Sequence, residues 1–354
     1  MNKLVKKHID KIRDCLDLEY YDNQKEKVQN LVDKIFESVI VEGMDRFVKD
    51  DTHKVIVNTH RTTLDDFLPH LELYKYHQIP MRSVGGQNLA IPFLTVPVFG
   101  ITLIADIKKM GLIKLDRIYN RQKSENGRAH REAYISVLGK LDMRLIPLWF
   151  ALSDGRSKSG ELLKAIAGTV KRIIEPKVEQ EKALTFYPST LDMDIIHEDK
   201  NFQTNASTVK KWGPKLGRFI NAIKDANTIF IEAPRAKVKG TAYLVIGHPM
   251  KYDHEYYSSR YKNPTLQFAR EIREQQIKNM TLTAPMIYFY CKHHNLEIAK
   301  IIDSAHNNLS RIGINCESVN SVTEYTEKLF HNRKVGQYYV NYGAHILDKI
   351  INFK

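Results

Sequence analysis

Short apolar runs separated by longer helical stretches recur along this chain and limit what it can fold into. The runs are rich in Val, Ile and Leu and are bounded by Gly, Pro or polar residues, which is typical of buried strands. They span residues 55–57, 81–84, 111–117, 144–150, 183–188, 228–231 and 242–247. Strands that alternate with helices predict an α/β fold, a mixed sheet flanked by helices.

Both ends of the chain read as helical additions to that sheet. Apolar residues at helical spacing, through Val28, Ile35 and Val39, predict helices up to about residue 49. From Pro264 onward a similar stripe includes Phe268, and helices are expected to the end. No repeat or low-complexity linker marks a boundary. The predicted division is an N-terminal helical cap (1–50), an α/β domain (51–255) and a C-terminal helical region packed on it (256–354).

The charge balance favours anionic partners. Lys and Arg (54) outnumber Asp and Glu (41), which leaves a net charge of +13. Such a surface attracts phosphorylated substrates, anionic lipid or nucleic acid. No aromatic-basic pattern of a nucleic-acid module accompanies the charge, so we expect no nucleic-acid partner.

The cysteines suit a reducing compartment, and the apolar segments predict no membrane-spanning helix. Cys15, Cys291 and Cys316 are odd in number and widely separated, so a disulfide framework is not expected. No secretory signal or membrane-spanning run is apparent. The nearest approach, residues 89–107, is interrupted by Pro92 and contains further breaks. It is either core or a hydrophobic lip in a membrane interface.

His60 and Asp65 form the first candidate chemical unit. His60 follows the 55–57 run at a predicted strand-to-helix corner, and Asp65 comes five residues later. A carboxylate at one ring nitrogen would leave the other free to take a proton from a hydroxyl, as general-base catalysis requires. The alternative is structural, because Thr62 with Asp65 fits a capping box in which Asp65 only accepts backbone N–H bonds.

The loop at 151–160 is a candidate anion site. Two glycines bracket two cations and two hydroxyls, and a helix predicted over 161–174 would point its first N–H groups the same way. The candidate ligands are Gly155, Arg156, Ser157 and Lys158. Phosphate suits this composition best, and a solvated basic turn is the alternative.

Four ordered blocks resemble the glycerolipid acyltransferases. His60-Arg-Thr-Thr-Leu-Asp65 resembles their His-x4-Asp signature, and 111–117, which ends in Arg117, resembles the second block. Residues 155–160 are similar to the third block, and Pro188 to the fourth. Residues 85–89 and 338–345 resemble further stretches of the bacterial-type glycerol-3-phosphate branch, and 245–249 resembles the closing strand of the family. One departure is Ser153-Asp154, where the family usually has Glu before the glycines.

The resemblance implies transfer of a fatty acyl group to the 1-hydroxyl of glycerol 3-phosphate, a step of phospholipid synthesis that gives lysophosphatidate. The donor would be acyl-CoA or acyl carrier protein thioester, with no further cofactor and no metal. His60 would be the general base, oriented by Asp65. The substrate-binding residues carried over are Arg117, Gly155, Arg156, Ser157, Lys158 and Pro188. The expected location is cytoplasmic, peripheral on the anionic inner face of the membrane.

Two alternatives remain open. The acceptor could be dihydroxyacetone phosphate or lysophosphatidate, which share the phosphate and the hydroxyl. The protein could also be an inactive homologue that binds lipid or anions, for which Ser153 is the only encouragement.

Overall fold

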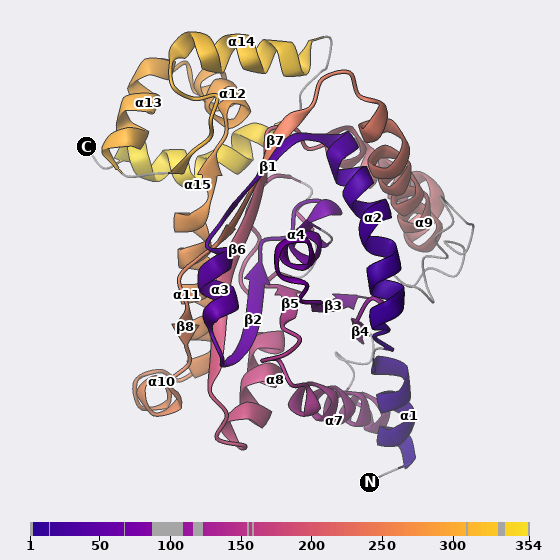
Figure 1. Ribbon diagram of the computed structural model, residues 1–354. Coiled ribbons are helices and arrows are strands. Elements are labelled where there is room, and N and C mark those ends of the chain that lie inside the picture. Colours follow the sequence, from indigo (N-terminus) through magenta and orange to yellow (C-terminus); the bar gives the residue numbers. More distant parts are fainter. Residues whose placement is uncertain are drawn as a thin grey trace.

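A single large sheet organises the chain (Figure 1). The computed structural model describes residues 3–13, 15–66, 68–86, 109–115, 123–153, 156–157, 159–308, 311–331 and 337–352. Within them the strand order is β1-β7-β6-β2-β5-β3-β4, and β8 pairs with β6. The strands of this sheet are β1 (Phe36–Glu42), β2 (His53–Asn58), β3 (Arg82–Gly86), β4 (Leu112–Leu115), β5 (Leu148–Ala151), β6 (Leu184–Met193), β7 (Gly240–Ile246) and β8 (Met250–Lys251). A separate parallel pair, β9 (Thr281–Leu282) and β10 (Arg311–Ile312), lies in the C-terminal region that was expected to be helical.

The sheet is mixed, with parallel pairing at its centre. Strand β2 is parallel to β5 and β6, and β3 is parallel to β4 and β5. Strand β6 is antiparallel to β7 and β8, while β1 returns parallel to β7. The predicted mixed α/β sheet flanked by helices is therefore confirmed. Carboxyl ends of β2, β5 and β6 meet at one edge, where ligands of parallel sheets commonly bind.

Helices cover both faces of the sheet, as Figure 1 shows. They are α1 (Lys3–Ile12), α2 (Leu18–Ile35), α3 (Met44–Lys49), α4 (Leu68–His77), α7 (Glu125–Lys140), α8 (Ala167–Val178), α9 (Asp199–Asn227), α10 (His254–Arg260), α11 (Pro264–Asn279), α12 (Ala284–His294), α13 (Ile298–Asn307), α14 (Val319–Phe330) and α15 (Tyr338–Asn352). Strand β2 is buried throughout because helices pack on both of its faces. Val55 and Val57 join the cluster under α1, α7, α8 and α11, and Ile56 joins the cluster with α2 to α4 and α12 to α15.

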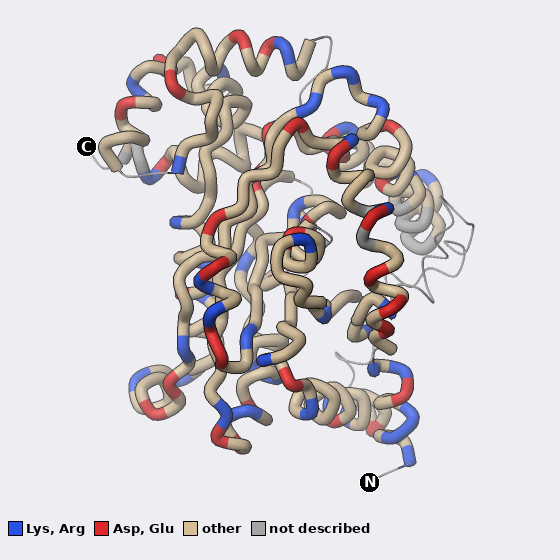
Figure 2. The backbone as a smooth tube through the Cα atoms, in the orientation of Figure 1, with Lys and Arg blue, Asp and Glu red and all other residues tan. Residues whose placement is uncertain are grey.

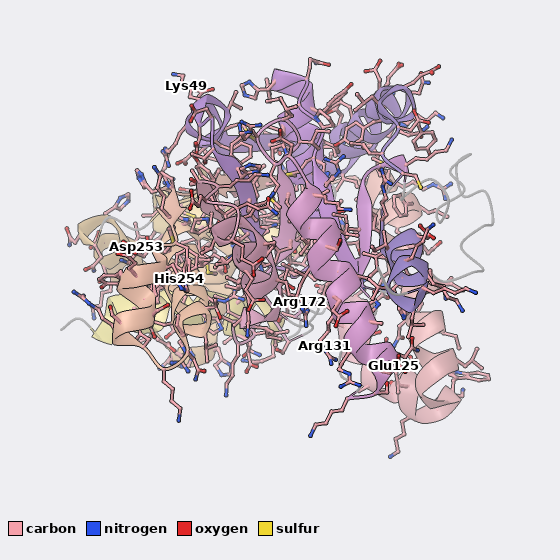
Figure 3. The ribbon with its side chains drawn as sticks, turned by 90° about the horizontal axis from the view of Figure 1, so that it is seen from below. Lys49, Glu125, Arg131, Arg172, Asp253 and His254 are labelled. Carbon is pink, nitrogen blue, oxygen red and sulfur yellow. The ribbon has the colours of Figure 1, made fainter. Side chains whose placement is uncertain are left out.

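Charged side chains lie mostly on the outer helices and loops, and the central strands carry few of them (Figure 2). Seen from below, α7 carries Glu125 and Arg131 across the molecule, with Arg172 of α8 nearby (Figure 3). Burial lowers the pKa of Arg172, and the guanidinium lies over the Tyr134 ring at 5.6 Å.

Three of the sequence predictions are wrong in detail. The N-terminal helix predicted through Val39 ends at Ile35, and residues 36–42 are strand β1. The run 228–231 is a π-helical turn that continues α9, not a strand. The helix predicted over 161–174 begins only at Ala167. In the first two cases the apolar spacing was compatible with both states, and sheet pairing or helix continuation decided. In the third, the N–H groups of Leu162 and Ile166 donate to His345 and to the carbonyl of Leu152, so these residues stay outside the helix. The three-part division of the chain stays a prediction.

Candidate active site

The ends of β2, β5 and β6 bring the first and third motifs together. The register pairs Val57 with Pro188 of β6 and Asn58 with Ala151 of β5. The backbone N–H of Ser157 donates to the carbonyl of His60 at 2.9 Å. The loop predicted to bind an anion is therefore fastened to the corner that carries the candidate base.

His60 and Asp65 lie next to each other at this corner. The distance from His60 Nδ1 to Asp65 Oδ2 is 3.9 Å, longer than a hydrogen bond but close enough for strong attraction once the imidazole is charged. The His60 side chain is 15 % exposed and the Asp65 side chain 0 % exposed. The rings of His60 and Trp149 are arranged edge to face, and their centroids are 6.4 Å apart. The imidazole is thus partly open to solvent while its carboxylate neighbour is sealed.

Asp65 also makes the backbone contacts of the structural alternative. Its Oδ2 accepts the N–H groups of Arg61 and of Thr62, the latter at 2.8 Å. The turn it closes is a short 3-10 turn (Leu64–Asp66), and α4 begins only at Leu68. Burial raises the pKa of Asp65 to about 6, opposed by Arg61 and these N–H groups. The two interpretations coexist, since backbone donors hold the carboxylate in place beside the imidazole. The catalytic role stays a prediction.

Arg61, next to the candidate base, is anchored to the C-terminal helix. It is buried, and its Nη2 donates to Asp192 Oδ1 at 2.8 Å and to the carbonyl of Leu191 at 2.7 Å. The guanidinium lies over the Tyr342 ring at 3.7 Å, and the Tyr342 hydroxyl donates to Asp192. Burial raises the pKa of Asp192 to about 6, and Arg61 opposes that rise. This network ties α15 to the strand ends.

Arg156 is surrounded by acidic groups that the sequence did not reveal. Its Nη1 donates to Glu198 Oε1 at 2.8 Å and to Thr63 Oγ1 at 2.6 Å. Its Nη2 donates to Asp225 Oδ2 at 2.7 Å. Glu198 and Asp225 lie 42 and 69 residues further along the chain, on either end of α9, so no local pattern could have indicated them. Burial raises the pKa of Glu198 to about 7, with Arg156 opposing.

Ser157 and Pro188 occupy buried positions at the same edge. Ser157 is 2 % exposed, and its hydroxyl has no hydrogen-bond partner among the described residues. The carbonyl of Pro188 accepts the Gly247 N–H at 2.8 Å and Asn279 Nδ2 at 3.0 Å. A Cβ at Gly247 would lie 2.1 Å from Asn279 Nδ2, so only glycine fits. Arg117, Gly155 and Lys158 lie outside the described residues, as do Asp154 and the apolar stretch 89–107.

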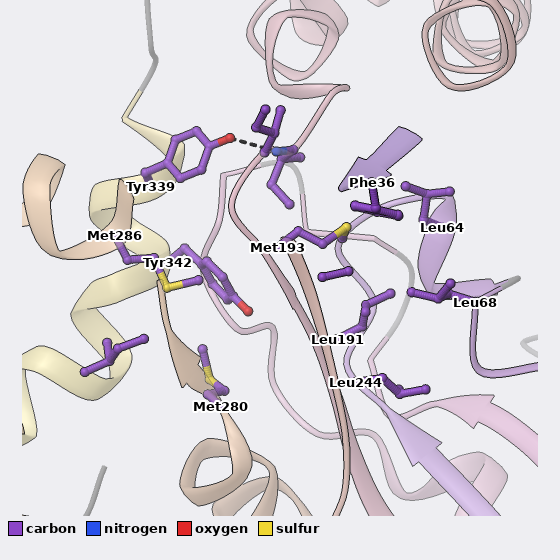
Figure 4. Packing of buried hydrophobic residues seen from close by; sticks show 14 of the residues in the cluster. Phe36, Leu64, Leu68, Leu191, Met193, Leu244, Met280, Met286, Tyr339 and Tyr342 are labelled. Carbon is purple, nitrogen blue, oxygen red and sulfur yellow. Dashed lines mark hydrogen bonds between the residues drawn. The ribbon is translucent and has the colours of Figure 1, made fainter. Parts of the chain in front are cut away.

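The C-terminal motif, to which the sequence gave no role, holds the third motif in place. His345 Nε2 accepts the N–H of Leu162 at 2.8 Å, and Asn341 Nδ2 donates to the carbonyl of Ser159 at 2.9 Å. Gly160 has a φ of +87°, and a Cβ there would lie 2.2 Å from the Tyr338 carbonyl oxygen. In the same helix the Tyr339 hydroxyl accepts the N–H of Ile196 at 2.7 Å (Figure 4). Residues 159–162 are therefore clamped by α15.

Neither a metal cluster nor a long apolar helix occurs in the part of the chain that the structure describes. No group of three His, Cys, Asp or Glu residues there could hold a metal ion. None of the helices described is long and apolar enough to cross a bilayer. Cys15, Cys291 and Cys316 are free.

Comparison with protein-family models gives no match, and comparison with curated proteins gives none either. Among solved structures, the chain is similar to the crystal structure of the 1-acyl-sn-glycerophosphate (LPA) acyltransferase PlsC from Thermotoga maritima. The TM-score is 0.36 at 11% sequence identity, and the match covers 73% of this chain and 78% of that one. Because identity and TM-score are both low, the functional proposal rests on this chain's own residues.

Proposed function

We propose that this protein is a glycerolipid acyltransferase that moves a fatty acyl group to the 1-hydroxyl of glycerol 3-phosphate. The acyl donor is the thioester of coenzyme A or of acyl carrier protein, and the net charge of +13 suits work at an anionic membrane surface. The observation that carries the proposal is the pairing of a partly exposed His60 with a buried Asp65, 3.9 Å apart, at the carboxyl ends of the central strands. The other motif residues described at this edge, Arg156, Ser157 and Pro188, support it.

In the proposed mechanism His60 Nε2 takes the proton of the acceptor hydroxyl as its oxygen attacks the thioester carbonyl carbon. The carboxylate of Asp65 lies beside Nδ1 and stabilises the imidazolium that forms. The C–S bond then breaks, and the departing thiolate receives the proton from His60. An ester and a free thiol result, without an acyl-enzyme.

The acceptor phosphate is proposed to bind Arg117, Arg156 and Lys158, with Gly155, Ser157 and Pro188 shaping the site. Arg156 already contacts Glu198 and Asp225, so phosphate would displace one carboxylate from it. The raised pKa of Glu198, caused by burial, favours that exchange because a protonated carboxyl holds a guanidinium less tightly.

An in vitro assay tests the proposal directly. Purified protein is offered glycerol 3-phosphate, dihydroxyacetone phosphate or lysophosphatidate, each with acyl-CoA and with acyl carrier protein thioester. His60→Ala is expected to lower kcat by at least about 100-fold, because a general base contributes that much, while the melting temperature stays close to wild type.

His293→Ala, which changes an exposed histidine at the end of α12, is the matched control and should keep full activity. Full turnover by His60→Ala would rule out this mechanism. Preference for another acceptor would redirect the substrate assignment, and absence of transfer with every pair would favour an inactive binding homologue.

A further inference from the structure

Arg273 on α11 is a buried cation that has no counter-ion among the residues that the structure describes. The residue is 9 % exposed, and its Nε, Nη1 and Nη2 are all buried. Within the part of the chain that the structure describes, none of the three nitrogens has a hydrogen-bond partner. A guanidinium offers five N–H donors in a planar fork, and no described residue accepts a hydrogen bond from any of them in Arg273.

The same face of α11 reaches the strand ends that carry the candidate base. Gln276 lies one turn after Arg273, which places the two side chains on one face. Gln276 Nε2 donates to the carbonyl of Val57 at 2.7 Å and of Ser189 at 3.3 Å. Val57 precedes His60 by three residues. Arg273 lies one turn before Gln276 on this helix, and its guanidinium is near enough to Arg61 and His345 for an electrostatic effect to shift a pKa in each pair.

The charged group that acts most on Arg273 is another cation, Arg61. Burial, and to a smaller extent Arg61, lower the pKa of Arg273 to about 10. Burial likewise lowers the pKa of His345 on α15; Arg61 and Arg273 lower it as well, and Glu161 and Asp348 oppose them. Of these two arginines, Arg61 forms an ion pair with Asp192, whereas Arg273 forms none with any described residue. Burying an unpaired charge is costly, and hydrogen bonds from a bound anion would offset part of that cost.

We propose that Arg273 is a phosphate-binding residue of this site and takes the phosphate of a substrate through its guanidinium fork. The assignment of that phosphate rests on the function proposed above. The acceptor and coenzyme A both carry phosphate, so the ligand class is an organic phosphate. Because the guanidinium nitrogens are covered, the anion reaches them by displacing neighbouring side chains.

Binding of glycerol 3-phosphate, inorganic phosphate and coenzyme A, each measured separately by calorimetry on the full chain, tests the proposal. Arg273→Gln should weaken binding of the cognate phosphate by about 10- to 100-fold, the worth of charge-assisted hydrogen bonds, and Arg273→Lys should recover part of it. Arg270→Gln, an exposed arginine on the same helix, is the matched control and should bind as wild type. Selective loss of glycerol 3-phosphate binding assigns the acceptor, and selective loss of coenzyme A binding assigns the donor.

Equal affinities of wild type and Arg273→Gln for all three ligands would overturn the proposal. A second readout separates binding from a structural role: without ligand, Arg273→Gln should melt no lower than wild type, and a clear drop would assign Arg273 to the fold instead. The two proposals also fail separately. Acyl transfer by wild type with unchanged phosphate binding by Arg273→Gln removes only this inference. Lost phosphate binding in a protein that transfers no acyl group removes only the enzyme assignment.

Discussion

Two arginines at the carboxyl-end edge of the sheet have opposite surroundings. Arg156 contacts two buried carboxylates, Glu198 and Asp225, at 2.8 and 2.7 Å. Arg273 is more deeply buried, and none of its nitrogens has a partner among the described residues. Arg156 therefore joins the third motif to α9 through two ion pairs, whereas no ion pair of Arg273 occurs in the described ranges, which is why we propose it as a ligand-binding residue. The difference shows that an arginine inside a motif can be paired with distant carboxylates, while an arginine outside every motif can be buried with no such pair among the described residues.

The largest expected effect comes from breaking the Arg156 cluster. Arg156→Met leaves Glu198 and Asp225 buried without their cation, which should lower the free energy of unfolding by about 3 to 5 kcal/mol. Urea denaturation measures this change. Arg144→Met is the matched control, because Arg144 and Asp142 form an exposed pair whose attraction is screened by solvent, so the loss of stability should be much smaller. Equal losses in the two variants would contradict a structural Arg156.

The next effect concerns pH and Glu198. Burial raises the pKa of Glu198 from 4.5 to about 7, so the folded state binds this proton more tightly than the unfolded chain does. Stability from this group is therefore present below pH 4.5 and is lost as the pH rises through 7. Between pH 4 and pH 8 the wild type should lose about 3 kcal/mol more than Glu198→Gln, which stays neutral. Denaturation at both pH values measures the difference, and a wild type that gains stability would show that Arg156 outweighs burial.

The smallest effect is expected at Arg273. Replacing an unpaired buried guanidinium by the apolar side chain in Arg273→Met should leave the free energy of unfolding unchanged or raise it by about 1 kcal/mol. Urea denaturation without ligand measures it, alongside Arg270→Met as the exposed control. If Arg273→Met lowered the free energy of unfolding by several kcal/mol, Arg273 would stabilise the fold as Arg156 does, and the contrast between the two arginines would be wrong.

Much of the sheet was predictable because its strands are short, buried runs of apolar residues. The predicted runs overlap β2, β3, β4, β5, β6 and β7. Strand β1 was missed because its apolar residues continue the spacing of α2, and only its pairing with β7 shows that it is extended. The convergence of His60, Ser157 and Pro188 on one edge followed from each lying in or after a strand.

By itself the sequence determined the α/β class and the turn that brings Asp65 back to the His60 corner. These depend on periodicity and on hydrogen bonds between residues only a few positions apart, such as those from Arg61 and Thr62 to Asp65. Tertiary structure alone decided which charges meet. Glu198 reaches Arg156 from 42 residues away, and no acid reaches Arg273 from any described residue. Such pairings depend on how helices pack onto the sheet, and spacing along the chain does not encode them.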